Sequence, residues 1–572
     1  MNQPQAKRPY SYHTFIFPFL FDEGSKKITR SMFEKCLHPG FKKEILDVTR
    51  DNEDTSEYAC YRYFNHTARN AIYSKGNEES IVWNYRLDMN SFAISNEDYV
   101  NGANGNDSEK PLVTLEIVKK TLEDDNNYEC EQGAPNEQDS RKLFREVIDL
   151  QTKLTVNGIR AKLFDTGVGM LIFELENYST DSESDVNKIN EYGRRVFRPF
   201  VDFKKNILIK DETGHVREVD EYEACSLCAD SLTLRYGDVT IVDGGLGGKG
   251  DDGLCEIKLA PIVTLLLTNQ KNKKCISPRI SGIEKGYKKT VVTNGEAVNY
   301  DKFYIEPIID DRMFVACVYN VPKAAKEICA WNAEQKQYRY ISDATEMELT
   351  EDNIAQRFYE MVFVDGNGLT CQNRTKLREM NEEHSFARWI EYDTILGISE
   401  YSMVCITKDE VDVFNINPFL TEYIEMVILV LAQRASLLAF ERSISEVTCN
   451  KKSKLSVEGI HRRYVAFESE LLLAEVTSQQ QGIEIYDMML KNLFIDKLKK
   501  DMLEQIDSLY DLDTACHERK ENFLLNLLAT FCAAGEIGEI LGGLLGSSGL
   551  SIEGICLPLI KIAIPSLFIF QY

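Results

Sequence analysis

The sequence predicts a large cytosolic α/β (α+β) body, a long helical stalk and two C-terminal transmembrane helices. Short runs of β-branched and aromatic residues alternate with helical patterns from Met1 to about Asn450. No proline stands between Pro418 and Pro558, and most of that stretch is rich in helix-forming residues. Because two apolar runs end the chain, we expect a body over residues 1–450, stalk helices over 451–520 and a membrane hairpin over 521–572.

The amino-acid composition indicates which kinds of binding partner to expect. The chain has 572 residues and a formal net charge of -25, from 91 acidic and 66 basic side chains. Binding to a nucleic-acid backbone needs clustered Lys and Arg, so we expect no direct nucleic-acid partner. The 15 cysteines are scattered and include one C-x-x-C pair, Cys225 and Cys228. Reduced cytosolic thiols are the expected state, rather than a disulfide framework or a zinc site.

The body is expected to begin with a strand. The N-terminal run YSYHTFIFPFLFDEG contains Pro18 and lacks a small-residue cleavage site, which favours a buried strand over a signal peptide. Residues 138–150, QDSRKLFREVIDL, have a helical pattern, and the acidic piece over 122–140 predicts an exposed loop. Further strands are predicted in KPLVTLEIV (110–118), GVGMLIFELEN (167–177), DVTIVDG (238–244), LCEIKLAPIVTLLL (254–267) and RMFVACVYNV (312–321).

Two long helices are expected after the last strand. Residues 417–447 have a helical pattern with an apolar middle, but Glu425 and the pair Gln433 and Arg434 interrupt the apolar run. We therefore expect a buried helix of the body there, not a membrane span. From Ile483 to Leu545 the pattern predicts one helix, roughly 95 Å long. Such a helix usually packs against its own copies or a second long helix, for which residues 455–477 are the candidate.

The two apolar runs at the C-terminus are long enough to cross a membrane. Phe523 to Leu545 spans about 23 residues, and Gly554 to Phe570 about 17, which is the short end of the usual range. Arg519 and Lys520 precede the first run, so this end and the bulk of the chain are expected to be cytoplasmic. The alternative is a soluble helical hairpin, but two such runs in tandem favour the membrane.

Two glutamates stand inside the first predicted span. Glu536 and Glu539 are three residues apart and share a helix face. A charged side chain at membrane depth usually faces a water-filled path. Copies arranged around an axis would give a narrow cation path with an acidic mouth. With the polar residues Asn526 and Thr530 of the same span, they form the predicted ion pathway.

This layout resembles the CorA family of divalent-cation channels, most strongly in HERKENFLLNLLATF over residues 517–531. The resemblance implies a pentameric ring in a lipid bilayer that conducts Mg²⁺ or another divalent cation. CorA channels carry a Gly-Met-Asn signature after the first span, whereas this chain reads GGLLGSSGLS over residues 542–551. The resemblance therefore covers the plan of the pore and not its magnesium selectivity.

The body resembles the CorA-like membrane effectors found beside type III CRISPR systems. The resemblance lies in HTFIFPF over residues 13–19 and INEYGRRVFRPF over residues 189–200. It implies an antiviral channel of the bacterial inner membrane. The implied ligand is a nucleotide second messenger, a conjugate of S-adenosylmethionine and AMP.

One arginine cluster is the candidate site for that ligand. Arg194, Arg195 and Arg198 could hold the messenger's phosphate, because guanidinium groups bind phosphate well. The alternative is that they form ordinary ion pairs with the surplus carboxylates. The glycine-rich stretch over 243–253 lacks the Gly and Ser/Thr positions of a phosphate loop and predicts a hairpin loop.

No hydrolase or paired-metal motif occurs, so we do not predict an enzyme. The leading expectation is a ligand-gated cation channel. The alternatives are a CorA-like magnesium transporter and a non-channel nucleotide-binding protein whose C-terminal hairpin mediates assembly.

Overall fold

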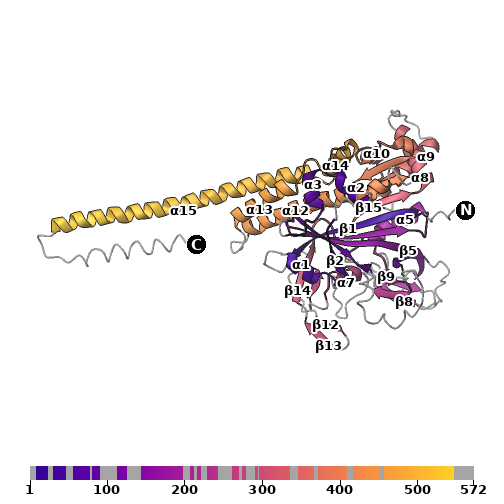
Figure 1. The fold of residues 1–572 in the computed structure, drawn as a ribbon, viewed down its shortest axis with the longest axis horizontal. Helices are drawn as coiled ribbons and strands as arrows, with labels where there is room; N and C mark the ends of the chain where they lie inside the picture. The colour runs from indigo at the N-terminus through magenta and orange to yellow at the C-terminus, as the bar shows by residue number, and fades with distance from the viewer. Residues whose placement is uncertain are drawn as a thin grey trace, which may run out of the picture.

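The computed structural model describes residues 8–22, 30–46, 56–77, 80–89, 112–124, 143–196, 206–210, 216–220, 228–242, 260–269, 274–278, 290–293, 296–299, 301–334, 346–365, 371–408, 416–449 and 456–545. Within them the chain forms a mixed α/β body and one very long helix (Figure 1). The mixed α/β class expected from the sequence is confirmed.

The centre of the body is strand β1 (Ser11–Asp22), which is the predicted N-terminal strand. Its side chains alternate: Phe15, Phe17 and Phe19 enter the core on one face, and Ile16 enters the core on the other. One edge of β1 pairs along its length with β6 (Val168–Asn177). Its other edge pairs first with β15 and then with β14.

A 16-stranded sheet surrounds β1. Its main order is β10 (Val239–Val242), β9 (Ser231–Tyr236), β4 (Val113–Asp124), β5 (Leu143–Phe164), β6, β1, β15 (Phe314–Asn320), β18 (Ser402–Thr407), β17 (Thr394–Ile398) and β16 (Ser385–Phe386). Off this path lie β2 (Phe41–Glu44), β3 (Val82–Leu87), β7 (Asn206–Lys210), β8 (Val216–Asp220), β11 (Lys274–Pro278) and β14 (Asp301–Pro307). Strands β12 (Thr290–Thr293) and β13 (Glu296–Asn299) form a separate pair.

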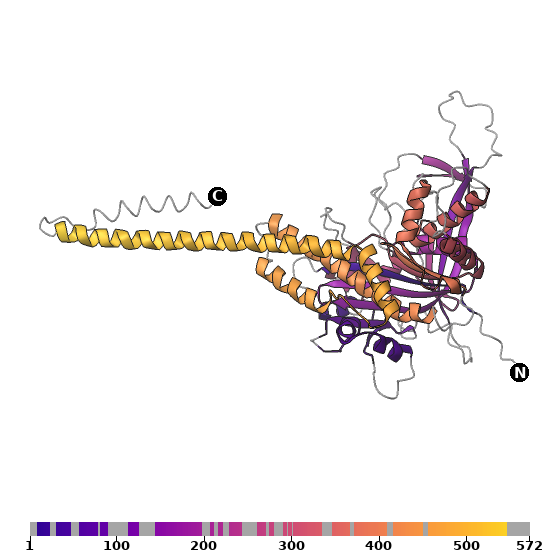
Figure 2. The same ribbon diagram turned by 90° about the horizontal axis from the view of Figure 1, so that it is seen from above.

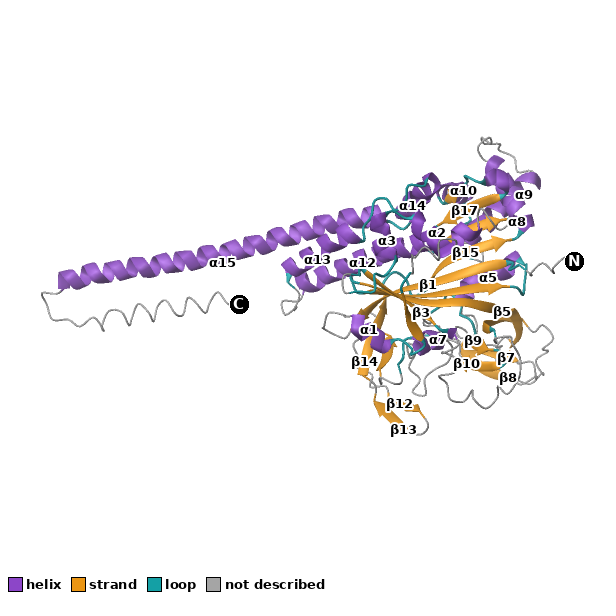
Figure 3. Ribbon diagram, viewed as in Figure 1, coloured by secondary structure: helices purple, strands orange, loops and turns teal. Residues whose placement is uncertain are grey.

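Helices cover both faces of the sheet, so the body has three layers and two cores (Figure 3). The core with Phe15 is closed by α1 (Arg30–Cys36), α5 (Glu183–Gly193), α7 (Pro261–Leu266), α8 (Pro322–Glu334), α9 (Glu346–Phe363) and α10 (Arg374–Glu383). The core with Ile16 is closed by α2 (Ser56–Tyr63), α3 (His66–Ile72), α11 (Ile416–Pro418), α12 (Ile424–Cys449), α13 (Val457–Glu470), α14 (Gln480–Asn492) and the start of α15 (Ile495–Leu545).

Three sequence predictions about these elements are wrong. The helix expected over 138–150 is a strand from Leu143 onward, because β5 pairs with β4 and this pairing overrides a helical pattern. The strand expected over 254–267 is wrong for its described part, because Pro261–Leu266 form helix α7 with Pro261 at the first position. The strands expected near 110–118, 167–177, 238–244 and 312–321 are confirmed as β4, β6, β10 and β15.

The third correction concerns the long helix. Instead of one helix from Ile483 to Leu545, α14 ends at Asn492 and α15 begins at Ile495. Phe494 between them has a φ of 60°, in the left-handed region that a helix cannot pass through. The glycine-rich stretch over 243–253 lies outside the described residues, as does the predicted loop beyond Asp124.

Helix α12 is the predicted buried helix. Among the described residues, one helical stretch, Ile416–Thr448, is long and apolar enough to cross a membrane, and 83% of its most apolar window is buried. It lies between the sheet and helices α13 to α15. Burial of this extent is typical of a core helix, in agreement with the expectation.

Helix α15 leaves the body after its first turns. Met502 and Ile506 are buried in the second core, whereas most described side chains from Tyr510 to Thr530 are exposed. Its 51 residues make a rod of about 75 Å. Figure 2 shows it extending from the sheet and helices of the body in one direction.

Candidate functional site: an arginine cluster and a projecting helix

The first two predicted ligand-binding residues, Arg194 and Arg195, directly follow helix α5. A fully buried network fixes this helix on the sheet. His13 on β1 donates from Nδ1 to the Asn190 side-chain oxygen at 2.7 Å, and Asn190 donates to the Tyr319 hydroxyl at 2.9 Å. Burial lowers the pKa of His13 to about 4, against the opposing effect of the Asn190 hydrogen bond, so the imidazole is neutral near pH 7.

Arg194 and Arg195 are both buried and share one partner. Their Nη2 atoms donate to the two carboxylate oxygens of Glu191, at 2.8 Å and 2.5 Å. Both arginines therefore form ion pairs, as the alternative interpretation expects, but these pairs do not use all of their N–H donors. The Nε of each has no hydrogen-bond partner although it is buried. Arg198, the third predicted residue, lies outside the described residues.

The turn between β14 and β15 adds more charge beside α5. The amide of Met313 donates to the carbonyl of Arg194 at 2.8 Å. Arg312 donates to Asp310 from Nη2 at 2.6 Å. Burial, with the hydrogen bond and charge of Asp310, raises the pKa of Asp311 to about 6.

A strained residue contacts the same place. Val364, just after α9, has a φ of 51°, and its carbonyl accepts from Arg194 Nη2 at 2.9 Å. The neighbouring Val362 carbonyl accepts from Ser399 and Ser402 in the turn between β17 and β18. A β-branched residue with positive φ is rare and costly, and such residues gather at functional sites.

Arg434 on α12 is the fourth arginine of this region. Its Nε and Nη1 are buried and have no hydrogen-bond partner. Burial lowers its pKa, and the charge of Glu400, Tyr401 and Asp310 partly offsets that effect. The charge of Asp310 acts on Arg434 and also on Arg312 and Arg194, so one carboxylate links these groups electrostatically. We call Arg194, Arg195, Arg312 and Arg434 the arginine cluster.

The arginine cluster is suited to an anion. Its carboxylates, chiefly Glu191 and Asp310, hold the guanidinium groups in place while several N–H groups stay unsatisfied. A phosphate with three acceptor oxygens could satisfy such donors. Sequence reasoning missed Arg312 and Arg434, since they lie far from Arg194 along the chain. The one signal was an arginine inside the apolar run of α12.

The predicted ion pathway lies on the projecting helix. Asn526 and Thr530 are exposed on α15, and the Thr530 hydroxyl donates to the Asn526 carbonyl at 2.7 Å. Glu536 and Glu539 lie on the same helix, one turn apart.

The second predicted span, from Gly554 to Phe570, lies outside the described residues. The described part of the chain contains no group of three or more His, Cys, Asp or Glu side chains that could hold a metal ion. No family model matches the chain, and neither a curated protein nor a solved structure matches it. Function must therefore be argued from the residues themselves.

Proposed function

We propose that the chain is a ligand-gated, homo-oligomeric membrane cation channel of the CorA type, acting as an antiviral effector of a type III CRISPR system. One observation carries the proposal: the long helix that leaves the body exposes a row of apolar side chains. Phe523, Leu524, Leu525 and Leu528 are between 51% and 64% exposed. Each such side chain gains about 1.5–3 kcal/mol when it leaves water. A lipid bilayer is the environment that would cover them.

The ion pathway in this proposal runs along the glutamate face of α15. Glu536 and Glu539 of each copy would surround a common axis and attract cations. Low-dielectric walls would strengthen the field of these carboxylates. Mg²⁺ and other divalent cations are the expected substrates by resemblance to CorA, in a ring of five copies. A second span after the helix would complete the hairpin in the bacterial inner membrane.

The gating ligand would bind the body. The arginine cluster suits the phosphate of a nucleotide, and the resemblance to CRISPR effectors suggests a conjugate of S-adenosylmethionine and AMP. Since α15 begins in the second core of the body, a shift of that core would move the whole rod. Ligand binding at the arginine cluster could in this way change how neighbouring stalks pack.

A membrane-extraction and flux experiment tests the proposal. The full chain should stay with membranes through a high-salt wash and need detergent for release. Reconstituted in liposomes, it should conduct cations when the nucleotide conjugate is added. The triple change Leu524→Ser, Leu525→Ser and Leu528→Ser should move protein to the soluble fraction, because it removes several kcal/mol of apolar transfer energy per copy.

Leu512→Ser is the matched control, since Leu512 is 64% exposed on the same helix but precedes the predicted span. It should leave membrane association unchanged. Release of the unmodified chain by high salt alone would contradict the channel proposal.

The same exposed row also favours a second function: a nucleotide-binding interaction protein whose hairpin only mediates assembly. In that case the apolar side chains would pack between copies in water. The two functions differ in the extraction experiment, because an assembly hairpin would give a soluble oligomer. A membrane-bound chain that conducts without nucleotide would instead support a CorA-like transporter.

A further inference from the structure

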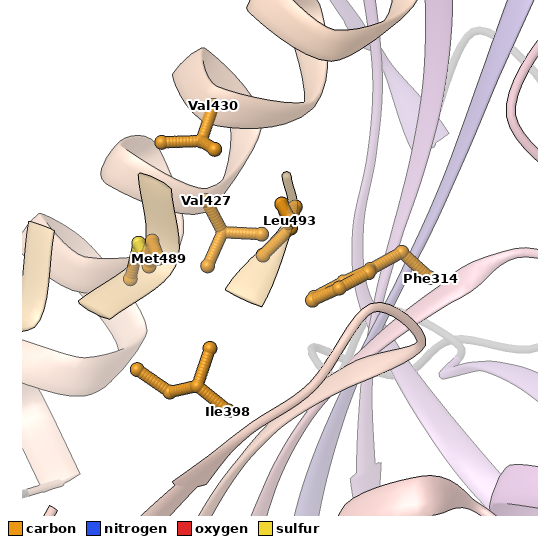
Figure 4. A pocket seen from close by; sticks show the side chains of 6 residues that line it. All are labelled: Phe314, Ile398, Val427, Val430, Met489 and Leu493. Carbon is orange, nitrogen blue, oxygen red and sulfur yellow. The ribbon is translucent and has the colours of Figure 1, made fainter. Parts of the chain in front are cut away.

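The break between α14 and α15 forms a joint, and contacts with the body fix its α14 side. Asn492 donates its side-chain amide to the carbonyl of Ile398 at 2.9 Å. Leu493 is buried and lines a small apolar gap together with Val427 of α12 and Met489 of α14 (Figure 4). The end of α14 is therefore anchored to β17 and α12.

The other side of the joint is much less constrained. Phe494 is 46% exposed and adopts a φ of 60°, at a cost of roughly 1–2 kcal/mol for a residue other than glycine. The guanidinium of Arg434 lies 5.8 Å from the centroid of the Phe494 ring. A change in the position of Arg434 would therefore act directly on the first residue before α15.

Arg434 has hydrogen-bond donors that a ligand could use. Its Nε and Nη1 lack hydrogen-bond partners, and Asp310 links it electrostatically to Arg312 and Arg194. Tyr401 contacts Arg312, whose guanidinium lies 5.1 Å from the centroid of the Tyr401 ring. Contacts thus join the end of α5 to Arg312 and Tyr401, and the charge of Asp310 acts from there on Arg434, beside the start of α15.

We infer that Arg434 binds the phosphate of a nucleotide and passes this occupancy to α15 through Phe494. The inference rests on the proposed function, which it deepens by naming a binding residue on α12 and the joint that it controls. A bound phosphate would accept hydrogen bonds from the Nε and Nη1 groups of Arg434. It would thereby either move the guanidinium away from the Phe494 ring or fix it against that ring. Either change would alter the direction or the mobility of the rod.

Hydrogen–deuterium exchange on the full chain in detergent tests the inference, with AMP and inorganic phosphate as separate probes. AMP should slow exchange of the amides from Leu490 to Leu498 by at least about fivefold, the low end of measured couplings. The same slowing with inorganic phosphate would show that the phosphate alone is recognised. Slowing with AMP only would assign the site to a nucleotide.

Two variants separate binding from coupling. Arg434→Gln should abolish the AMP-dependent slowing of amide exchange both at the joint and in the turn from Ser399 to Ser402. In Phe494→Leu, exchange should still slow in that turn but no longer at the joint, because only the ring contact is removed. Arg463→Gln is the matched control: Arg463 also lies over a phenylalanine ring, that of Phe440, at 5.9 Å, but far from the joint in sequence.

The outcomes are distinct. Full slowing in Arg434→Gln, or none with either probe in the unmodified chain, would overturn the inference. Slowing in the turn but not at the joint of the unmodified chain would overturn the coupling step. Exchange is measured without any ion flux, so a failure here differs from a failure to conduct cations, which would overturn the proposed function instead.

Discussion

Helices α12 and α15 are two long helices that each contain an apolar run, but the surroundings of the two runs differ. The apolar window of α12 is 83% buried within the body. The apolar residues of α15 near Leu524 have no such cover, and Leu528 is 64% exposed. The difference teaches that burial against a packing partner, and not an apolar run alone, distinguishes a core helix from a candidate membrane span.

The acidic residues of the two helices sharpen this contrast. Glu425 of α12 is buried, and its carboxylate accepts from Arg160 at 2.5 Å and from Lys162 at 2.7 Å. Burial would raise the pKa of Glu425, but the charges of Lys162 and Arg160 hold it at about 2. A charge inside an apolar helix is tolerated here because strand β5 supplies its partners. For Glu536 and Glu539 we propose a water-filled path instead.

The largest expected effect comes from a leucine-to-lysine substitution made once in each helix. Leu431→Lys puts a charge at a fully buried site of α12 and should cost the body about 4–5 kcal/mol or more. Leu528→Lys should leave the melting temperature of the body unchanged, since Leu528 is exposed on α15. It should weaken membrane insertion by about 2.5–3.5 kcal/mol per copy. Thermal melting and membrane extraction measure the two effects.

Equal loss of body stability in both variants would break the contrast, because it would mean that α15 packs against the body beyond Leu509.

The second prediction concerns Glu425. Glu425→Gln removes the carboxylate from two buried cations and should destabilise the body by about 3 kcal/mol. The pKa of Glu425 is depressed in the folded state, so its contribution is present above about pH 4.5 and is lost as pH falls toward 2. Urea unfolding of the two proteins at several pH values measures this, and their stabilities should converge at low pH. A difference that is constant with pH would point to packing rather than charge.

Part of this contrast was predictable from the sequence. Glu425, Gln433 and Arg434 interrupt the run of α12 and correctly indicated a buried helix. The apolar N-terminal run correctly indicated a buried strand, which is β1. Local patterns of this kind depend on neighbours along the chain, which the sequence displays directly.

Other features depend on residues distant in sequence and were not predictable. The described part of the helix expected over 138–150 is strand because β4 and β7 pair with it, and no local signal reports that pairing. The arginine cluster joins Arg194 to Arg312 and Arg434, which only the folded sheet brings together. The break at Phe494 carries no glycine or proline, so the sequence gives no warning of it.

The third prediction tests the acidic residues of α15. The double change Glu536→Gln with Glu539→Gln keeps shape and hydrogen bonding but removes the charge. In the proposed channel it should lower cation flux roughly tenfold, the low end of electrostatic focusing, and weaken the preference for cations over anions. Liposome flux with cation and anion gradients measures both quantities. Ligand binding and assembly should not change.

Unchanged flux would place these side chains outside the ion path. Loss of assembly would give them a structural role like that of Glu425, and the two helices would then differ less than we propose.

The smallest expected effect lies at the joint between α14 and α15. In an ordinary helix alanine is more stable than glycine by about 1 kcal/mol. At Phe494 the φ of 60° reverses this order, because glycine adopts the left-handed region without strain. Phe494→Gly should therefore be more stable than Phe494→Ala by roughly 1 kcal/mol, since both lose the ring above which Arg434 lies. The same pair at exposed, helical Leu512 should show the ordinary order in urea unfolding. If alanine were the better residue at both positions, α14 and α15 would form one continuous helix in solution, and the joint would not exist.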